Sequence, residues 1–221
     1  MKKKFIPYSD YTEPTPAEMK NRADEYYSEM SKRRTVRHFS DRPVPLEIIK
    51  TCLKTASTAP SGAHMQPWSF VVVSDDELKL KIHVASEQVE ENFYTNPANR
   101  SWIKDLEPMG VNQSKPFLAA APYLIAVFYQ SYGFHPDGTR RKHYYVKESV
   151  GIATGLLISA IHHVGLTSLT YTPSKNSYLN DLLNRPQNEK PYLVLVVGYP
   201  EDNVMVPDIK RKSLEDIATF V

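Results

Sequence analysis

Cysteine is almost absent from this sequence, because Cys52 is the only one among 221 residues. An internal disulfide is therefore impossible, and zinc sites built on repeated cysteines are not indicated. The seven histidines do not compensate, since His162 and His163 are adjacent and point to different faces of a helix. Cys52 occupies an apolar position of a helix-like segment, which favours a buried small side chain over a nucleophile. We expect no bound metal and a reducing, cytoplasmic compartment.

Long apolar runs and a strong net charge are lacking as well. No stretch of about 18 apolar residues occurs, so no membrane-spanning helix is expected. The basic start, MKKK, is not followed by the apolar core of a signal peptide. The net charge of +2 is too small to indicate nucleic acid or an anionic membrane as the main partner. With 41% hydrophobic and 24% charged residues, the composition is that of one globular domain with appendages.

Glycine is scarce, with eight in the chain, and no Gly-x-Gly-x-x-Gly motif follows a strand-like segment. A Rossmann dinucleotide site is therefore not indicated. One glycine, Gly62, stands in residues 58–68 (TAPSGAHMQPW), between a helix-like and a strand-like segment. We expect a rigid loop there, whose free backbone N–H groups could meet a planar or anionic ligand. Taken alone, such a loop is an ordinary helix-to-strand connector.

The hydrophobic periodicity predicts helices and strands that alternate along the chain. Helices are expected at 17–32, 45–56, 77–94, 143–164 and 178–184, and buried strands at 69–73, 122–128, 166–172 and 192–197. Residues 133–141 are expected to form a loop, and 95–116 a polar connector with a short helix. A connector of that length often serves as a lid. The pattern predicts an α+β fold with a central mixed sheet and flanking helices.

Two features point to contacts that one chain does not complete. Small residues recur every four positions on the helix at 143–164, namely Gly151, Gly155 and Ser159. They form a face suited either to a tight crossing within the chain or to a dimer interface. The tail at 204–221 carries apolar residues without an evident partner in its own domain, namely Leu214, Ile217 and Phe220. We expect this tail to pack on a second subunit.

Basic and polar motifs surround the loop. RRTVR (33–37) lies upstream, and LTYTP (169–173) and KRK (210–212) lie downstream. Arginine donates paired hydrogen bonds to phosphate, although a short basic run is by itself more often a solvated surface patch. Glu90 and Tyr94 share a helix face, and together with Lys115 they could hold both charges of a free amino acid. The alternative for Glu90 is a solvated acidic face.

Together these motifs resemble the nitroreductase-like flavoprotein family, and within it the enzymes that remove halide from halogenated tyrosines with FMN. The phrases RRTVR, TAPSGAHMQPW, KHYYVKES, LLNRP, VGYP and VPDIKRK occur in order from residue 33 to near the C-terminus. The resemblance implies an intertwined homodimer with the flavin at its interface. It also implies an N-terminal arm and helix (1–32), a flavin-binding domain (33–203) with a lid at about 90–115, and a C-terminal extension (204–221).

The resemblance further implies a set of site residues. Contacts to FMN are expected from Arg33, Arg34, Thr35, Arg37, Pro60, Ser61, Gly62, Thr170, Thr172 and Arg211. Thr172 is the expected catalytic residue, with its hydroxyl at the flavin N5, and Tyr171 stands where a threonine is expected. The substrate's phenolate would meet the backbone N–H of Ala63, its ammonium Glu90, and its carboxylate Tyr94 and Lys115.

The implied activity is reductive dehalogenation of 3-iodotyrosine, and of the bromo and chloro analogues, to tyrosine and halide. Electrons would pass one at a time from reduced FMN. Three alternatives remain at this point: a general NAD(P)H-dependent nitroreductase, a flavin-binding sensor without turnover, and an enzyme that fragments its own flavin. Fold alone does not choose among them, so the substrate prediction depends on Glu90, Tyr94 and Lys115.

Overall fold

The computed structural model describes residues 5–221, and the chain divides into two units, Met1–Arg33 and Arg34–Val221. The first unit contains helix α1 (Pro16–Ser31), whose N-terminus is closed by a capping box. Thr15 Oγ1 accepts a hydrogen bond from Glu18 N at 3.3 Å, and Glu18 Oε2 accepts one from Thr15 N at 2.7 Å. No residue of α1 is buried, so local capping rather than packing defines this helix.

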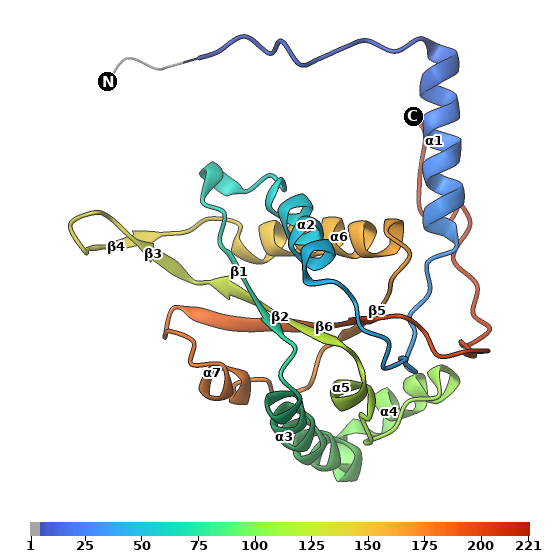
Figure 1. Ribbon diagram of the computed structural model, residues 1–221, viewed down its shortest axis with the longest axis vertical. Helices are drawn as coiled ribbons and strands as arrows, with labels where there is room; N and C mark the ends of the chain where they lie inside the picture. Colours follow the sequence, from blue (N-terminus) through green and yellow to red (C-terminus); the bar gives the residue numbers. More distant parts are fainter. Residues whose placement is uncertain (1–4) are drawn as a thin grey trace. The chain divides into compact units, whose positions relative to one another are not determined.

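The second unit is built on a four-stranded sheet between two helical layers (Figure 1). The strand order is β1 (Trp68–Val73), β2 (Tyr123–Gln130), β6 (Glu189–Gly198) and β5 (Thr167–Tyr171). Helices α2 (Leu46–Ser57) and α6 (Val146–His163) cover one face, and α3 (Asp76–Thr95), α5 (Phe117–Ala120) and α7 (Tyr178–Leu182) cover the other. Between α3 and α5 the chain forms η2 (Pro97–Asn99), α4 (Arg100–Leu106) and η3 (Glu107–Met109).

The alternation of side chains along β2 produces two separate cores. Leu124, Ala126 and Phe128 pack toward α3, α5 and α7. The intervening residues Ile125 and Val127 pack toward α2 and α6. Because successive strand residues point to opposite faces, a continuous apolar run is needed where both faces are covered. Each such buried aliphatic side chain contributes roughly 1.5–3 kcal/mol relative to an exposed one.

The α+β class and the predicted strands are confirmed, with two differences in detail. Every neighbouring strand pair is antiparallel, and the only parallel pairing among the described residues is an isolated bridge between Thr35 and Ser168. The predicted loop at 133–141 was wrong, because β3 (Tyr132–Phe134) and β4 (Arg140–Lys142) form a hairpin there. Its turn is stabilised by Asp137, whose carboxylate accepts from Thr139 N at 2.9 Å. The basic sequence of β4 carries no apolar alternation, which is why the strand was missed.

Cys52 is a buried free thiol on α2, as predicted. No helix among residues 5–221 is long and apolar enough to cross a membrane. In the same described residues, no group of three or more potential metal ligands gathers.

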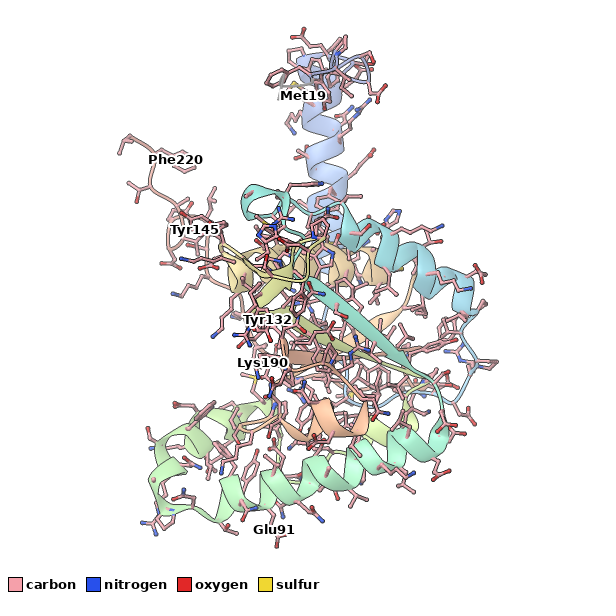
Figure 2. The ribbon with its side chains drawn as sticks, turned by 90° about the vertical axis from the view of Figure 1, so that its left-hand side faces the viewer. Met19, Glu91, Tyr132, Tyr145, Lys190 and Phe220 are labelled. Atoms are coloured by element: carbon pink, nitrogen blue, oxygen red, sulfur yellow. The ribbon has the colours of Figure 1, made fainter. Side chains whose placement is uncertain are left out.

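The two features expected at a dimer interface, the small residues of α6 and the apolar tail, include positions that are exposed in this chain. Among residues 5–221, a Cβ added at Gly155 would have no atom of another segment within 4 Å, so none of these segments crosses α6 closely at that point. In the tail, Ile217 and Phe220 are 69% and 82% exposed, and Phe220 projects outward (Figure 2). These observations leave the dimer interface, the lid and the division at 32/33 as predictions.

Candidate active site

A cavity of about 410 Å³ lies between α3, the segment that follows α4, and the end of β5. Six of the predicted site residues line it: Arg37, Glu90, Tyr94, Lys115, Thr170 and Thr172. Residues far apart in the sequence are thus brought together, as the prediction required.

The centre of the cavity is an ion pair between Glu90 and Lys115. Glu90 is 8% exposed and Lys115 is 6% exposed, and Lys115 Nζ lies 3.2 Å from Glu90 Oε2. Lys115 Nζ also donates to the carbonyl oxygen of Asn112. Glu90 therefore does not belong to a solvated acidic face, whereas the adjacent Glu91 is exposed and points away from the body (Figure 2). Burying an ion pair carries a desolvation penalty. A pair kept in a cavity in spite of that penalty is therefore a candidate for binding a charged ligand or for fixing the structure.

Burial and charge also set the protonation of the groups around this pair. Burial lowers the pKa of Lys115, and the carboxylate of Glu90 opposes that shift. Burial raises the pKa of Tyr94, and Glu90 adds to the effect, so the phenol of Tyr94 stays protonated and can donate. Lys115 Nζ lies 5.4 Å from the centroid of the Tyr94 ring, within cation–π range. The three predicted substrate-binding side chains therefore form one cluster.

The backbone of Lys115 is anchored to α3 by a second carboxylate. Glu87 Oε1 accepts from Lys115 N at 2.8 Å and from Ser114 Oγ at 2.9 Å. His83 Nδ1 lies 3.0 Å from the carbonyl oxygen of Lys115. Glu87 and His83 are one turn of α3 apart, so one helix face holds both sides of the same peptide segment.

The basic motif lies beside β5, the strand that carries the threonines. Val36 N donates to Ser168 O at 3.3 Å, which aligns residues 34–37 with this strand. Arg37 lines the cavity, and burial lowers the pKa of its guanidinium. Arg34 Nη2 donates to the carbonyl oxygen of Pro207, which ties this motif to the start of the tail. The pairing of residues 34–37 with β5 therefore brings the arginines of this motif close to the threonines of the strand.

Residues 60–63 do not line this cavity, although residue 62 was central to the prediction. Gly62 N donates to Ser149 Oγ at 3.3 Å, which holds the loop against the start of α6, on the opposite side of the sheet from α3. A Cβ at Gly62 would lie 2.7 Å from the carbonyl oxygen of Tyr144, so only glycine fits without a shift. Ser61 Oγ accepts from Gln66 N at 2.9 Å. The loop is rigid, but it packs against the start of α6 and does not line the cavity.

The shape of this loop is imposed against backbone preference. Ala63, His64 and Gln66 have φ values of 49°, 54° and 49°, a region that non-glycine residues rarely adopt. Such conformations persist only where surrounding contacts enforce them, and they are frequent at functional sites. The backbone N–H groups of the loop are thus fixed in direction before any ligand binds.

Three further predicted residues, Arg33, Thr35 and Arg211, do not line the cavity. Arg33 belongs to the first unit, and Arg211 lies on the exposed tail. Thr35 pairs with Ser168 and lies beside β5 without lining the cavity. The single chain therefore assembles the predicted substrate side chains and only part of the predicted cofactor contacts.

Tyr171 was not predicted as a site residue, although strand alternation could have indicated its direction. Thr170 and Thr172 are exposed, whereas Tyr171 between them is buried. Its hydroxyl donates to Glu90 Oε1 at 3.2 Å. Since alternate strand residues share a face, the residue between two cavity threonines must turn toward the core.

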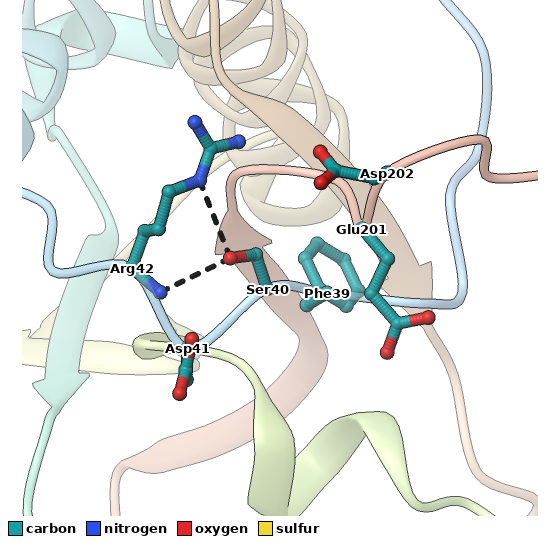
Figure 3. Close-up of a pocket in the computed structure, with 6 residues that line it drawn as sticks. All are labelled: Phe39, Ser40, Asp41, Arg42, Glu201 and Asp202. Carbon is teal, nitrogen blue, oxygen red and sulfur yellow. Dashed lines mark hydrogen bonds between the residues drawn. The ribbon is translucent and has the colours of Figure 1, made fainter.

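A second, larger cleft of about 530 Å³ is lined by Phe39, Ser40, Asp41, Arg42, Glu201 and Asp202 (Figure 3). Its arginine, Arg42, is engaged with Ser40 Oγ at 3.3 Å and stacks on the ring of Tyr199. Three carboxylates against one guanidinium disfavour an anionic cofactor, so this cleft is not the candidate site.

Comparison with known proteins places the fold and the motifs in one group. The family model named Nitroreductase family matches residues 30–199. This chain belongs to the nitroreductase family. It is 53% identical over 209 residues to the iodotyrosine deiodinase of Haliscomenobacter hydrossis, covering 95% of this chain and 94% of that one. It is 46% identical over 214 residues to the iodotyrosine deiodinase of Nematostella vectensis, covering 96% and 81%.

Among solved structures, the chain is similar to oxidized iodotyrosine deiodinase bound to FMN and 3-iodo-L-tyrosine. The TM-score is 0.74 at 34% identity, and the match covers 88% of this chain and 100% of that one. A nitroreductase-like protein from Streptococcus mutans, at 18% identity and a TM-score of 0.65, shares the fold alone. Both relatives named above, which are similar to nearly the whole of this chain, are iodotyrosine deiodinases.

Proposed function

We propose that this protein is an FMN-dependent reductive dehalogenase of halogenated tyrosines, with 3-iodotyrosine as the test substrate. The observation that carries the proposal is the buried pair of Glu90 and Lys115 in a cavity that Tyr94 also lines. A nitroaromatic has neither an ammonium nor a carboxylate to satisfy these charges. A free amino acid has both. The similarity of nearly the whole chain to iodotyrosine deiodinases supports the same choice.

Ligand binding would exchange one ion pair for two. Without a ligand, Glu90 and Lys115 neutralise each other at 3.2 Å. The ammonium of the substrate would take over Glu90, and its carboxylate would take over Lys115 and accept from the phenol of Tyr94. No charge is left buried without a partner at any stage, which avoids the large penalty for an isolated buried ion. The segment from about residue 90 to 115 would close over the bound amino acid as a lid.

The residues beside the cavity suit FMN in their chemistry. Arg34 and Arg37 offer guanidinium groups for a phosphate or a polar ring edge, and Thr170 and Thr172 present exposed hydroxyls at the end of β5. Arg33, Thr35 and Arg211 would complete these contacts, and Thr172 would donate its hydroxyl to the flavin N5. When bound, FMN supplies the two electrons that each carbon–halogen cleavage consumes. The chain's own task is to orient the phenol, bind its charges and exclude water.

The contacts that one chain leaves apart would come from a homodimer. Residues 60–63 lie against α6, and the apolar tail residues Ile217 and Phe220 are exposed. A second copy would place this loop over the cavity and cover the tail. The fixed N–H of Ala63 would then meet the phenolate, because a donor held in position stabilises the anion more than the neutral phenol. A cytoplasmic location is part of the same proposal, supported by the unpaired thiol of Cys52.

The decisive experiment is a single turnover without oxygen. The FMN-loaded protein is reduced, 3-iodotyrosine is added, and flavin absorbance is followed together with released iodide. We expect reoxidation with one iodide and one tyrosine formed per flavin. Reoxidation by a nitroaromatic but not by iodotyrosine would establish the general nitroreductase instead. A flavin that reacts with neither compound would favour a sensor, and loss of the flavin itself would reveal a flavin-fragmenting enzyme.

A further inference from the structure

The carboxylate of Glu90 has two oxygens, and each has its own partner from a different part of the fold. Oε2 faces Lys115 Nζ at 3.2 Å, from the segment that follows α4. Oε1 accepts from the hydroxyl of Tyr171 at 3.2 Å, from strand β5. The first partner is a group that the proposed substrate would engage. The second is part of the sheet and stays in place.

The phenol of Tyr171 is fixed by its surroundings. Its side chain is buried in the core, and its ring meets the ring of Phe117 edge-on, with centroids 5.8 Å apart. Beside its hydroxyl, Ser86 Oγ and Tyr178 Oη form a hydrogen bond of 2.7 Å. Burial strongly raises the pKa of Tyr171, with Tyr178 and Glu90 adding to the shift, so the hydroxyl remains a donor at physiological pH.

We infer, on the basis of the proposed function, that Tyr171 is a positioning residue for the ammonium subsite. Its hydroxyl holds the Glu90 carboxylate in the orientation that receives the substrate's ammonium once Lys115 turns to the carboxylate. When Lys115 turns from Glu90 to the carboxylate of the substrate, the Tyr171 hydroxyl is the donor that keeps the Glu90 carboxylate in place. A threonine at this position could not do the same, because its hydroxyl sits directly on Cβ and would end a ring's length short of Glu90.

Loss of Tyr171 should affect recognition of the ammonium end of the amino acid more than recognition of its carboxylate end. Tyr171 contacts Glu90, and among the described contacts its hydroxyl makes none to Lys115. Its loss should therefore weaken ligands that carry an ammonium and spare ligands that carry only a carboxylate. A merely structural role for Tyr171 would weaken every ligand alike, because a disturbed core would loosen the whole cavity.

The test uses the FMN-loaded protein and three ligands: 3-iodotyrosine, 3-iodotyramine, which lacks the carboxylate, and 3-(3-iodo-4-hydroxyphenyl)propanoate, which lacks the ammonium. Binding to the oxidised protein is followed by the change in flavin fluorescence. In Tyr171→Phe we expect roughly tenfold weaker binding of iodotyrosine and iodotyramine, as for loss of a hydrogen bond to a charged group. The propanoate should change by less than about twofold, since the Lys115 ammonium has three donors and, with no ligand ammonium competing, can stay with Glu90 while it binds the carboxylate.

Three further variants separate a positioning role of Tyr171 from a purely structural one. Tyr123→Phe is the matched control, because its buried hydroxyl donates to Val44 O at 3.0 Å on the opposite face of the sheet, away from Glu90. It should leave all three affinities unchanged. In a Glu90→Gln background, Tyr171→Phe should have no further effect on iodotyramine, because the group it positions no longer carries charge. Should Tyr171→Phe fail to fold, Tyr171→Met removes the same hydroxyl with an adaptable apolar side chain.

Equal weakening of all three ligands by Tyr171→Phe would overturn the inference, and so would an unchanged affinity for iodotyramine. The same selective pattern in Tyr123→Phe would overturn it as well. If the wild-type protein binds none of the three ligands, the proposed function fails and the inference falls with it. Wild-type binding without selective loss in Tyr171→Phe overturns the inference alone.

Discussion

The cavity around Glu90 and the loop at residues 60–63 treat their functional groups in opposite ways. In the cavity, the charged groups pair with each other inside one chain, and both members of the central pair are less than 10% exposed. In the loop, Ala63 is held in a left-handed conformation and Gly62 N donates to Ser149 Oγ of α6, yet none of residues 60–63 lines the cavity. The first region brings its charged groups together within one chain, and the second would act, on the proposed function, across an interface with a second copy.

This difference separates two kinds of recognition. The amino-acid end of the proposed substrate would be recognised by side chains that one chain assembles by itself. The phenol and part of the flavin would be recognised by a preformed backbone that a second copy brings to the cavity. Preorganised donors cost little reorganisation on binding, which suits a loop that acts across an interface.

The largest effect should follow from breaking the pair in the cavity. Glu90→Gln or Lys115→Gln should raise the Kd for 3-iodotyrosine roughly 100-fold, equivalent to about 3 kcal/mol. The reason is that each change removes the buried charge with which one charged group of the substrate would pair. FMN affinity should change little, because neither side chain is among the proposed flavin contacts. Isothermal titration of 3-iodotyrosine into the FMN-loaded variants measures the first quantity, and titration of FMN into the flavin-free variants measures the second.

The matched control lies on the exposed face of the same helix. Lys81 and Glu77 form an ion pair of 2.6 Å on α3, with side chains 57% and 75% exposed. Replacing either of them with glutamine should change ligand affinity by less than about twofold, as exposed pairs contribute little. Unaltered iodotyrosine binding in both Glu90→Gln and Lys115→Gln would rule out recognition of the zwitterion by this pair.

A smaller effect on stability should distinguish Gly62 in the loop from Gly155 on α6. Gly62→Ala should lower the free energy of unfolding by about 2 kcal/mol, because the added Cβ meets the backbone oxygen of Tyr144. Gly155→Ala meets no atom of the chain within 4 Å. It should raise helix stability by up to about 1 kcal/mol if that face of α6 is open in solution. Urea unfolding measures both changes.

Sedimentation of Gly155→Ala then tests the dimer directly. If a second copy packs closely at this face, the added methyl group should weaken the dimer, and stability should fall instead of rise. A dimer that stays intact while Gly155→Ala gains stability would remove α6 from the interface. The remaining contact would then have to come from the apolar tail at 204–221.

Much of the fold could be predicted because the strands are apolar on both faces and the helices are periodic. β2 and β6 appear as continuous apolar runs, and only a sheet covered on both sides needs such runs. The hairpin β3–β4 could not be predicted, because Arg140, Arg141 and Lys142 are exposed and their strand state comes from pairing alone. Local propensity does not encode a pairing between polar segments.

The candidate site shows the same limit. Glu90, Tyr94 and Lys115 could be recognised from their motifs, and the structure brings them together. That Glu90 is buried while Glu91 is exposed depends on which face of α3 meets the sheet, and the acidic run does not reveal it. The contact of Tyr171 with Glu90 joins β5 to α3, 81 positions away in the sequence, and only tertiary packing creates it.

The smallest effect should come from the anchor of Lys115. The backbone N–H of Lys115 is the main reason that the pKa of Glu87 lies below its ordinary value, although partial burial opposes the shift. A carboxylate whose pKa is depressed in the folded chain stabilises it above the unfolded pKa, about 4.3, and loses this contribution as pH falls through the lower folded value. Glu87→Gln should therefore cost about 1 kcal/mol at pH 7, discounted because the side chain is partly solvated.

Below about pH 4 the wild type and Glu87→Gln should converge in stability, because the wild-type carboxyl becomes neutral as well. Urea unfolding at several pH values between about 3 and 7 measures the convergence. Glu91→Gln is the control from one turn further along α3, because the side chain of Glu91 points to solvent (Figure 2). A gap between wild type and Glu87→Gln that stays constant with pH would mean that Glu87 contributes by packing and not through its charge.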